Sequence, residues 1–74
     1  MNDRDLVQET LRGDRAAYRQ LVERYRNAVY GLVLSYVGDF DAAEDLAQGA
    51  FIRGYYRLHT LEDGARFGAW LRTV

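Results

Sequence analysis

The chain has 74 residues, 49% of them hydrophobic and 14% aromatic, which suits one small domain with a core and excludes wholesale disorder. It has no cysteine and one histidine, which excludes disulfides and thiolate metal sites, so we expect no metal and no cofactor. Its net charge of −1 argues against tight binding of duplex DNA by the isolated chain, because such binding usually needs a clear positive excess.

The N-terminus, Met-Asn-Asp-Arg-Asp, is polar and mixed in charge, and no apolar segment follows it, so the sequence predicts no secretory signal. The longest apolar stretch, residues 32–34, is far too short to cross a bilayer. We therefore expect a cytoplasmic protein that does not enter a membrane.

The sequence predicts an all-α fold, a small bundle of three helices plus the start of a fourth, because proline is absent and turn residues cluster at only three places. The first helix is expected to run from Asp3, as N-cap, to about Arg12, with Gly13 in the left-handed position that follows a helix. Its apolar stripe comprises Leu6, Val7, Thr10 and Leu11.

The second helix is expected to begin after Asp14 as N-cap and to end at about Val37, where Gly38 stops it. Its apolar residues recur every three or four positions, which is the helical period and indicates a face packed on the core. This stripe comprises Tyr18, Leu21, Val22, Tyr25, Val29, Leu32, Val33 and Tyr36. The other side carries charges at ion-pair spacing, typical of a solvated face, at Arg19, Glu23 and Arg26.

The third helix is predicted to start at Asp41, which forms an analogue of the capping box with Glu44, and to continue to about Leu58. Its core-facing stripe comprises Ala43, Leu46, Ala47, Ala50, Phe51, Gly54 and Leu58. Its opposite face comprises Asp45, Gln48, Gly49, Ile52, Arg53, Tyr55 and Tyr56. Apolar and aromatic groups interleaved with polar ones are typical of a partner surface. The alternative is that a tyrosine packs under the following loop and that Ile52 is simply exposed.

A loop from His59 to Gly64 leads to residues 65–74, which indicate the opening of a fourth helix. Its stripe comprises Phe67, Trp70, Leu71 and Val74. Because no C-terminal stop signal follows, we expect residues 1–74 to be a single domain at the N-terminal end of a longer chain.

The loop and the fourth helix combine arginine with aromatic residues, the combination that binds single-stranded nucleic acid through phosphate contacts and base stacking. The basic residues are Arg66 and Arg72, and the aromatic ones are Phe67 and Trp70. The alternative is that both rings belong to the core, because they lie three residues apart and therefore share one helix face.

An enzyme is not indicated. His59 is the only histidine, and Ser35, the only serine, lies inside a helical pattern, so a nucleophile–base arrangement has little support. The carboxylates near Asp41 are explained by a helix N-terminus, where negative charge is favoured, and no glycine-rich phosphate loop is present.

Several short motifs follow one another along the chain in a recognisable order. They are Gly13-Asp14, Ala17-Tyr18, the segment from Leu21 to Tyr25, Ala43-Glu44-Asp45-Leu46-Ala47-Gln48 with Phe51, and Phe67-x-x-Trp70-Leu71. This series resembles region 2 of extracytoplasmic-function sigma factors, members of the sigma-70 family, over essentially the whole chain. The segment A-E-D-L-x-Q followed about twenty residues later by F-x-x-W-L is the more specific part.

The resemblance implies a helical domain that docks on the β′ clamp helices of core RNA polymerase and takes part in recognition and melting of the promoter −10 element. Polymerase contacts are implied for Asp45, Gln48, Ile52 and Tyr55. DNA contacts are implied for His59, Arg66, Phe67, Trp70 and Arg72. An anti-sigma factor is implied as a further partner. The alternative function is a sigma-like regulatory domain that binds polymerase or an anti-sigma factor without melting DNA.

The sequence departs from the family pattern at two places. Gly49 stands where the family commonly has glutamate, which removes a carboxylate from the docking face. Leu61 and Glu62 stand where the loop commonly carries an aromatic and then a basic residue. The resemblance implies that the loop from His59 to Arg66 captures a flipped base of the non-template strand, and the carboxylate of Glu62 is unfavourable beside a DNA strand.

Overall fold

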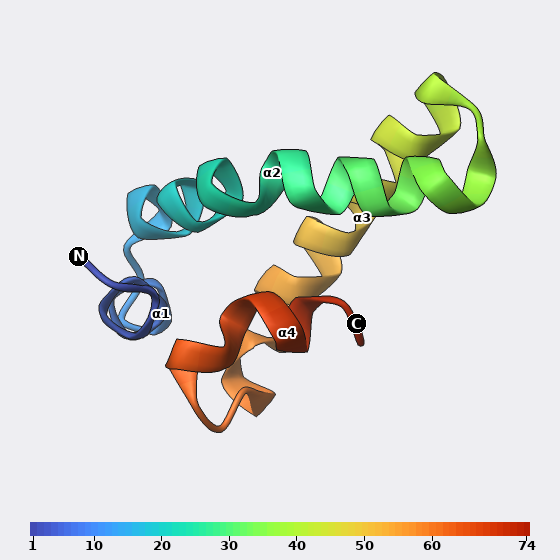
Figure 1. Cartoon of the computed structure of the whole chain (residues 1–74). Helices are drawn as coiled ribbons and strands as arrows, with labels where there is room; N and C mark the ends of the chain where they lie inside the picture. Colours follow the sequence, from blue (N-terminus) through green and yellow to red (C-terminus); the bar gives the residue numbers. More distant parts are fainter.

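The computed structural model describes residues 1–74 as four α-helices joined by short turns (Figure 1). The helices are α1 (Asp3–Leu11), α2 (Arg15–Val37), α3 (Phe40–Arg57) and α4 (Phe67–Leu71), with 3-10 turns η1 (Leu58–Thr60) and η2 (Gly64–Arg66) between α3 and α4. No strand is present. The predicted all-α fold, three helices plus the start of a fourth, is confirmed.

Both ends of α2 follow the sequence prediction. The Asp14 side chain accepts hydrogen bonds from the backbone N–H groups of Ala16 and Ala17, at 2.9 and 3.3 Å, which satisfies amides that have no partner within the helix. At the other end Gly38 adopts φ 69°, a left-handed conformation that lacks a steric penalty only for glycine. These two caps define a helix of 23 residues.

Two predicted N-caps are wrong. In α1 the cap is Asn2, whose side chain accepts from the Asp5 N–H at 2.9 Å, and this leaves the Asp3 carboxylate free to contact α2. In α3 the cap is Asp39, which accepts from the Asp41 N–H at 3.0 Å. The turn between α2 and α3 is therefore shorter than expected, and Asp41 lies in the first helical turn, where its charge is favourable.

The core lies where α1, α3 and α4 meet the first half of α2. It comprises Leu6, Val7, Ala17, Tyr18, Leu21, Phe51, Leu58, Phe67 and Leu71. Tyr18 connects α2 to α3, because its hydroxyl donates a 2.5 Å hydrogen bond to the Phe51 carbonyl of α3. The one buried polar side chain, Thr10, is satisfied by donating to the Leu6 carbonyl at 2.7 Å.

The distal half of α2 is not buried as predicted. Leu32 is 39% exposed and Tyr36 is 84% exposed, although both continue the apolar stripe. In Figure 1, α1 lies near the start of α2 and α3 crosses α2. Helix α4 contacts α2 through Phe67, which packs on Tyr18 and Tyr25 in the first half, so little covers the distal end. On α3, Leu46 was also predicted to face the core but is 47% exposed. A helical period indicates which residues share a face, but it does not say how far along the helix a partner extends.

Replacing Tyr18 with phenylalanine is expected to lower the free energy of unfolding by about 1 kcal/mol, because a buried hydrogen bond is lost. Burial also raises the pKa of Tyr18 from 10.0 to about 12. The pKa of Tyr18 is therefore higher in the folded than in the unfolded chain. The stability that this difference contributes is complete below pH 10 and is lost as the pH rises towards 12.

Urea unfolding at pH 7 and at pH 11 measures both effects. Tyr18→Phe should lose less stability than the parent over this interval. Tyr36→Phe, at an exposed position, is the matched control and should behave like the parent. An identical pH response in parent and Tyr18→Phe would contradict the assignment.

Candidate binding surfaces

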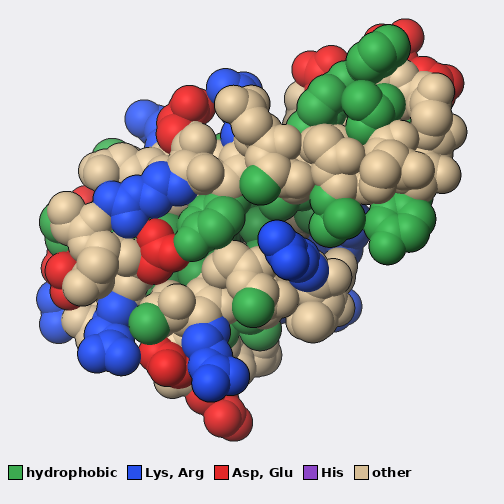
Figure 2. Space-filling view, in the orientation of Figure 1, with side chains coloured by type: hydrophobic (Ala, Val, Ile, Leu, Met, Phe, Trp, Pro, Cys, Tyr) green, Lys and Arg blue, Asp and Glu red, His purple; other side chains and the backbone are tan.

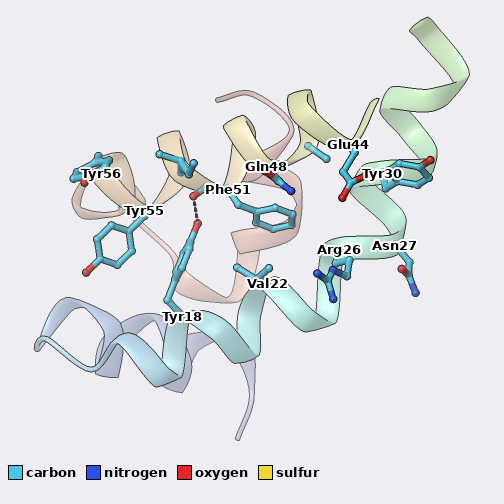
Figure 3. A pocket seen from close by; sticks show the side chains of 12 residues that line it. Tyr18, Val22, Arg26, Asn27, Tyr30, Glu44, Gln48, Phe51, Tyr55 and Tyr56 are labelled. Atoms are coloured by element: carbon cyan, nitrogen blue, oxygen red, sulfur yellow. Dashed lines mark hydrogen bonds between the residues drawn. The ribbon is translucent and has the colours of Figure 1, made fainter. Parts of the chain in front are cut away.

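A groove of about 710 Å³ runs between α2 and α3, and we call it the α2–α3 groove (Figure 3). It is lined by Tyr18, Val22, Arg26, Asn27, Tyr30, Glu44, Ala47, Gln48, Phe51, Ile52, Tyr55 and Tyr56. Tyr55 and Tyr56 stand at one end and Tyr30 and Glu44 at the other (Figure 3). An apolar trough with a few polar groups along its sides is a typical binding surface for a helix.

Three of the four residues predicted to contact polymerase line this groove. Gln48 and Tyr55 project from α3 into it, and Ile52, 59% exposed, forms part of its wall. The fourth, Asp45, is exposed on α3 but does not line the groove. The structure therefore brings Gln48, Ile52 and Tyr55 together and leaves Asp45 beside them.

The α2 side of the groove was missed by the sequence analysis. Val22, Arg26 and Tyr30 recur every fourth residue, so they follow one another along a single helix face. Arg26 was interpreted as part of a solvated face, and it is exposed with an ion pair to Glu23 at 3.2 Å. The spacing of four was a usable signal, but only the packing of α2 on α3 shows which face borders the groove.

Aromatic contacts hold one end of the groove in place. The ring of Tyr55 meets Tyr18 edge-on, with centroids 5.1 Å apart, and Tyr56 meets Tyr55 edge-on at 5.5 Å. Tyr18 is itself fixed by its hydrogen bond to α3. The alternative predicted a tyrosine packed under the following loop; Tyr55 instead packs on Tyr18 of α2, while Tyr56 remains 73% exposed.

Charge is unevenly distributed over the molecule. No arginine occurs between Arg26 and Arg53, a segment that carries four carboxylates, at Asp39, Asp41, Glu44 and Asp45. In Figure 2, basic side chains gather over α1, the first half of α2 and the segment before α4, whereas the end where α2 turns into α3 shows hydrophobic and acidic groups. The two ends of the molecule are therefore suited to partners of opposite charge.

The second surface, which we call the loop–α4 surface, extends from His59 to Arg72. His59, Arg66 and Arg72 are exposed there, as a nucleic-acid contact requires. Trp70 is half-buried and packs against Phe67, with centroids 6.1 Å apart. Residues 53–74 contain four arginines against two carboxylates, so this end carries a positive excess that the whole chain lacks.

The DNA contact predicted for Phe67 does not fit the structure. Its side chain is completely buried, and its ring packs against Tyr18 at 6.2 Å and Tyr25 at 5.5 Å. A ring enclosed on all sides cannot stack on a base. The alternative interpretation, in which Phe67 belongs to the core, is the correct one, because it lies on the inner stripe of α4 with Leu71.

The loop itself is held by a polar contact and an apolar one. Leu61 is half-buried against the core, and Glu62 is exposed. The Asp63 side chain accepts a hydrogen bond from the Ala65 N–H at 3.0 Å and so caps η2. This hydrogen bond, followed by the nearby guanidinium of Arg4, lowers the pKa of Asp63 below its usual value.

No three His, Cys, Asp or Glu side chains lie together in an arrangement that could hold a metal ion. None of the helices combines the length and the apolar character needed to span a bilayer.

Comparison with known proteins identifies the family. The family model described as sigma-70 region 2 matches residues 21–74. The chain is 38% identical over 72 residues to RNA polymerase sigma-H factor of Pseudomonas aeruginosa, covering 97% of this chain and 37% of that protein. It is 32% identical over 68 residues to the ECF RNA polymerase sigma factor SigW of Bacillus subtilis, covering 92% and 36%. It is 37% identical over 74 residues to the ECF RNA polymerase sigma-E factor of Escherichia coli, covering 100% and 38%.

The chain belongs to the sigma-70 region 2 family. Its relatives include ECF sigma factors, which confirms the resemblance inferred from the sequence motifs. The chain spans well under half the length of these relatives.

Proposed function

We propose that this chain is an RNA polymerase sigma factor domain that docks on the β′ clamp helices and takes part in recognition and melting of the promoter −10 element. The observation that carries the proposal is the α2–α3 groove, which collects Gln48, Ile52 and Tyr55 on a chain of the sigma-70 region 2 family. Residues 1–74 would form one region 2 domain within a longer protein that acts in the cytoplasm, by binding rather than by catalysis.

Docking is supported by the shape and chemistry of the groove. Apolar rings and aliphatic groups can pack on the side chains of a helical partner, while Gln48, Glu44 and Arg26 can hydrogen-bond at the edges. Glu44 is one of four carboxylates in the arginine-free segment between Arg26 and Arg53, so a basic partner surface would approach this segment favourably.

DNA binding is supported by the opposite charge of the loop–α4 surface. Arg66 and Arg72 are exposed there and suited to phosphate contacts, and His59 and part of Trp70 are accessible for base contacts. With a net charge of −1, the isolated chain is expected to bind DNA weakly. Docking on polymerase would raise the effective concentration of DNA at this surface, so weak contacts suffice.

Arg66→Ala tests this division between the two surfaces. The variant should bind β′ clamp helices like the parent, because Arg66 lies outside the α2–α3 groove. In the holoenzyme it should weaken promoter DNA binding about threefold and reduce its salt dependence, because one phosphate contact is lost. Arg19→Ala, at an exposed position of α2, is the matched control and should leave both measurements unchanged. Equal DNA binding by Arg66→Ala and the parent would contradict the assignment of this surface.

A second function is favoured by the composition of the loop. Glu62 places a carboxylate beside the proposed DNA path, and Phe67 is buried, so the surface offers fewer base contacts than the sequence implied. A sigma-like domain that binds polymerase or an anti-sigma factor without melting DNA would have these features. Permanganate reactivity of the −10 strand, which detects promoter opening by the holoenzyme, distinguishes the two functions. Promoter opening supports the sigma factor domain that melts DNA, and its absence supports the regulatory domain.

A further inference from the structure

Helix α1 lies outside the residues that the family model matches, yet it packs against the part of the chain proposed to contact DNA. It contacts α2, η2 and α4, and none of its residues lines the α2–α3 groove.

Gly64, the first residue of η2, sits directly on the backbone of α1. A Cβ atom at this position would lie 3.1 Å from the Arg4 Cα and 3.2 Å from the Val7 Cβ. The φ angle of Gly64 is not in the left-handed region, so the backbone itself would accept alanine. A Cβ here would press on the helix, and because Arg4 Cα is a backbone atom, the loop and α1 would have to move apart by a few tenths of an ångström.

A second contact joins the same two segments. The Arg4 guanidinium lies 3.4 Å from the Asp63 carboxylate, which also caps η2 through the Ala65 N–H. Asp63 therefore couples the shape of the loop to the position of α1. Both side chains are about half exposed, so the pair is a weak contributor to stability and serves chiefly to fix geometry.

The start of α1 is in turn anchored to α2 and, through it, to α4. Asp3 forms an ion pair with Arg24 at 2.9 Å and accepts a hydrogen bond from the Tyr25 hydroxyl. The Tyr25 ring packs against Phe67 and occupies the space beside Gly68, where a Cβ would lie 2.6 Å from the ring. Asp3 and Arg4 thus connect α1 to both sides of the loop–α4 surface.

We propose that α1 is a positioning element for DNA binding: through the Gly64 contact and the Arg4–Asp63 pair it holds the loop, and with it Arg66, at a fixed place relative to the α2–α3 groove. This inference rests on the proposed function and assigns a role to residues outside the matched family region. It requires that disturbing the α1–loop contact lowers DNA engagement while polymerase docking is unchanged.

A direct role for Arg4 in binding DNA phosphate is the competing explanation. Arg4 and Arg24 are both already paired with carboxylates, which lowers the positive potential they offer to a phosphate. A double-mutant cycle separates the two explanations, because an Arg4 that acts only through Asp63 loses its effect once the Asp63 charge is gone.

The main experiment compares Gly64→Ala with Gly31→Ala in holoenzyme assembled with core polymerase. Gly31 lies on the exposed side of α2 with no atom within 4 Å of a Cβ, so it is a matched control. Gly64→Ala is expected to slow promoter opening about threefold, because the loop and Arg66 are displaced, with β′ clamp-helix affinity unchanged. Gly31→Ala should change neither. Opening by Gly64→Ala at the parent rate would overturn the proposal, as would an equal loss of docking and opening.

The second experiment is the cycle of Arg4→Ala and Asp63→Asn, which does not depend on how well Gly64→Ala folds. Asparagine keeps the side-chain oxygen that caps η2 and removes the charge that Arg4 contacts. The two single variants and the double variant should slow opening by similar factors, and Arg12→Ala, at the exposed C-cap of α1, should have no effect. Effects that multiply in the double variant would overturn the positioning role in favour of direct DNA contact. The proposed function fails separately, if holoenzyme assembled with the parent chain does not open the promoter.

Discussion

Phe67→Ala is expected to be the most destabilising single replacement in this chain, lowering the free energy of unfolding by about 3–5 kcal/mol. The Phe67 side chain is completely buried and contacts the rings of Tyr18, Tyr25 and Trp70, so its removal leaves a cavity where α2 and α4 meet. A domain of this size without disulfide or metal has only a few kcal/mol of stability in total. The variant should therefore be largely unfolded at 25 °C, as measured by far-ultraviolet circular dichroism.

Phe40→Ala is the matched control for this replacement. Phe40 is 70% exposed at the start of α3, so the same change of side chain there should lower stability by less than about 1 kcal/mol. A folded Phe67→Ala that has lost only DNA binding would restore the DNA contact predicted from the sequence and contradict the core assignment.

Ile52→Glu is expected to weaken binding to the β′ clamp helices about tenfold or more while the domain stays folded. Ile52 is 59% exposed, so the replacement removes no core packing. It places a carboxylate in the wall of the α2–α3 groove, where the parent presents an apolar side chain. The new charge would lose its hydration when the groove is covered by the docked partner.

Leu46→Glu provides the control for Ile52→Glu. Leu46 is 47% exposed on the same helix but does not line the groove. The variant therefore introduces the same carboxylate outside the proposed interface. Leu46→Glu should bind like the parent. A loss common to both variants would show that negative charge anywhere on α3 weakens binding, and the groove would not be the docking site.

The sequence was sufficient to predict the features that local chemistry determines. The all-α fold follows from the helical period and the absence of proline, and the limits of α2 follow from Asp14 and Gly38. The motif around Gln48 predicted the docking helix, and the structure collects three of its four proposed contacts in one groove. Whether these residues touch polymerase stays a prediction.

The features that the sequence did not reveal depend on which helix lies beside which residue. The exposure of Tyr36 and Leu32 follows from the limited extent of α1 and α4, and the groove side formed by Arg26 and Tyr30 follows from the packing of α2 on α3. The sequence around Phe67 is the same whether its ring stacks on a base or fills the core. Only the packing in the folded structure distinguishes these two roles.

The central claim is that this chain docks on core RNA polymerase through the α2–α3 groove, and a calorimetric titration of β′ clamp helices tests it most directly. The parent should bind with one-to-one stoichiometry, Leu46→Glu should match it, and Ile52→Glu should bind about tenfold more weakly or not measurably. Circular dichroism of each variant confirms that it is folded. A folded parent that does not bind, or a folded Ile52→Glu that binds as tightly as the parent, would contradict the account.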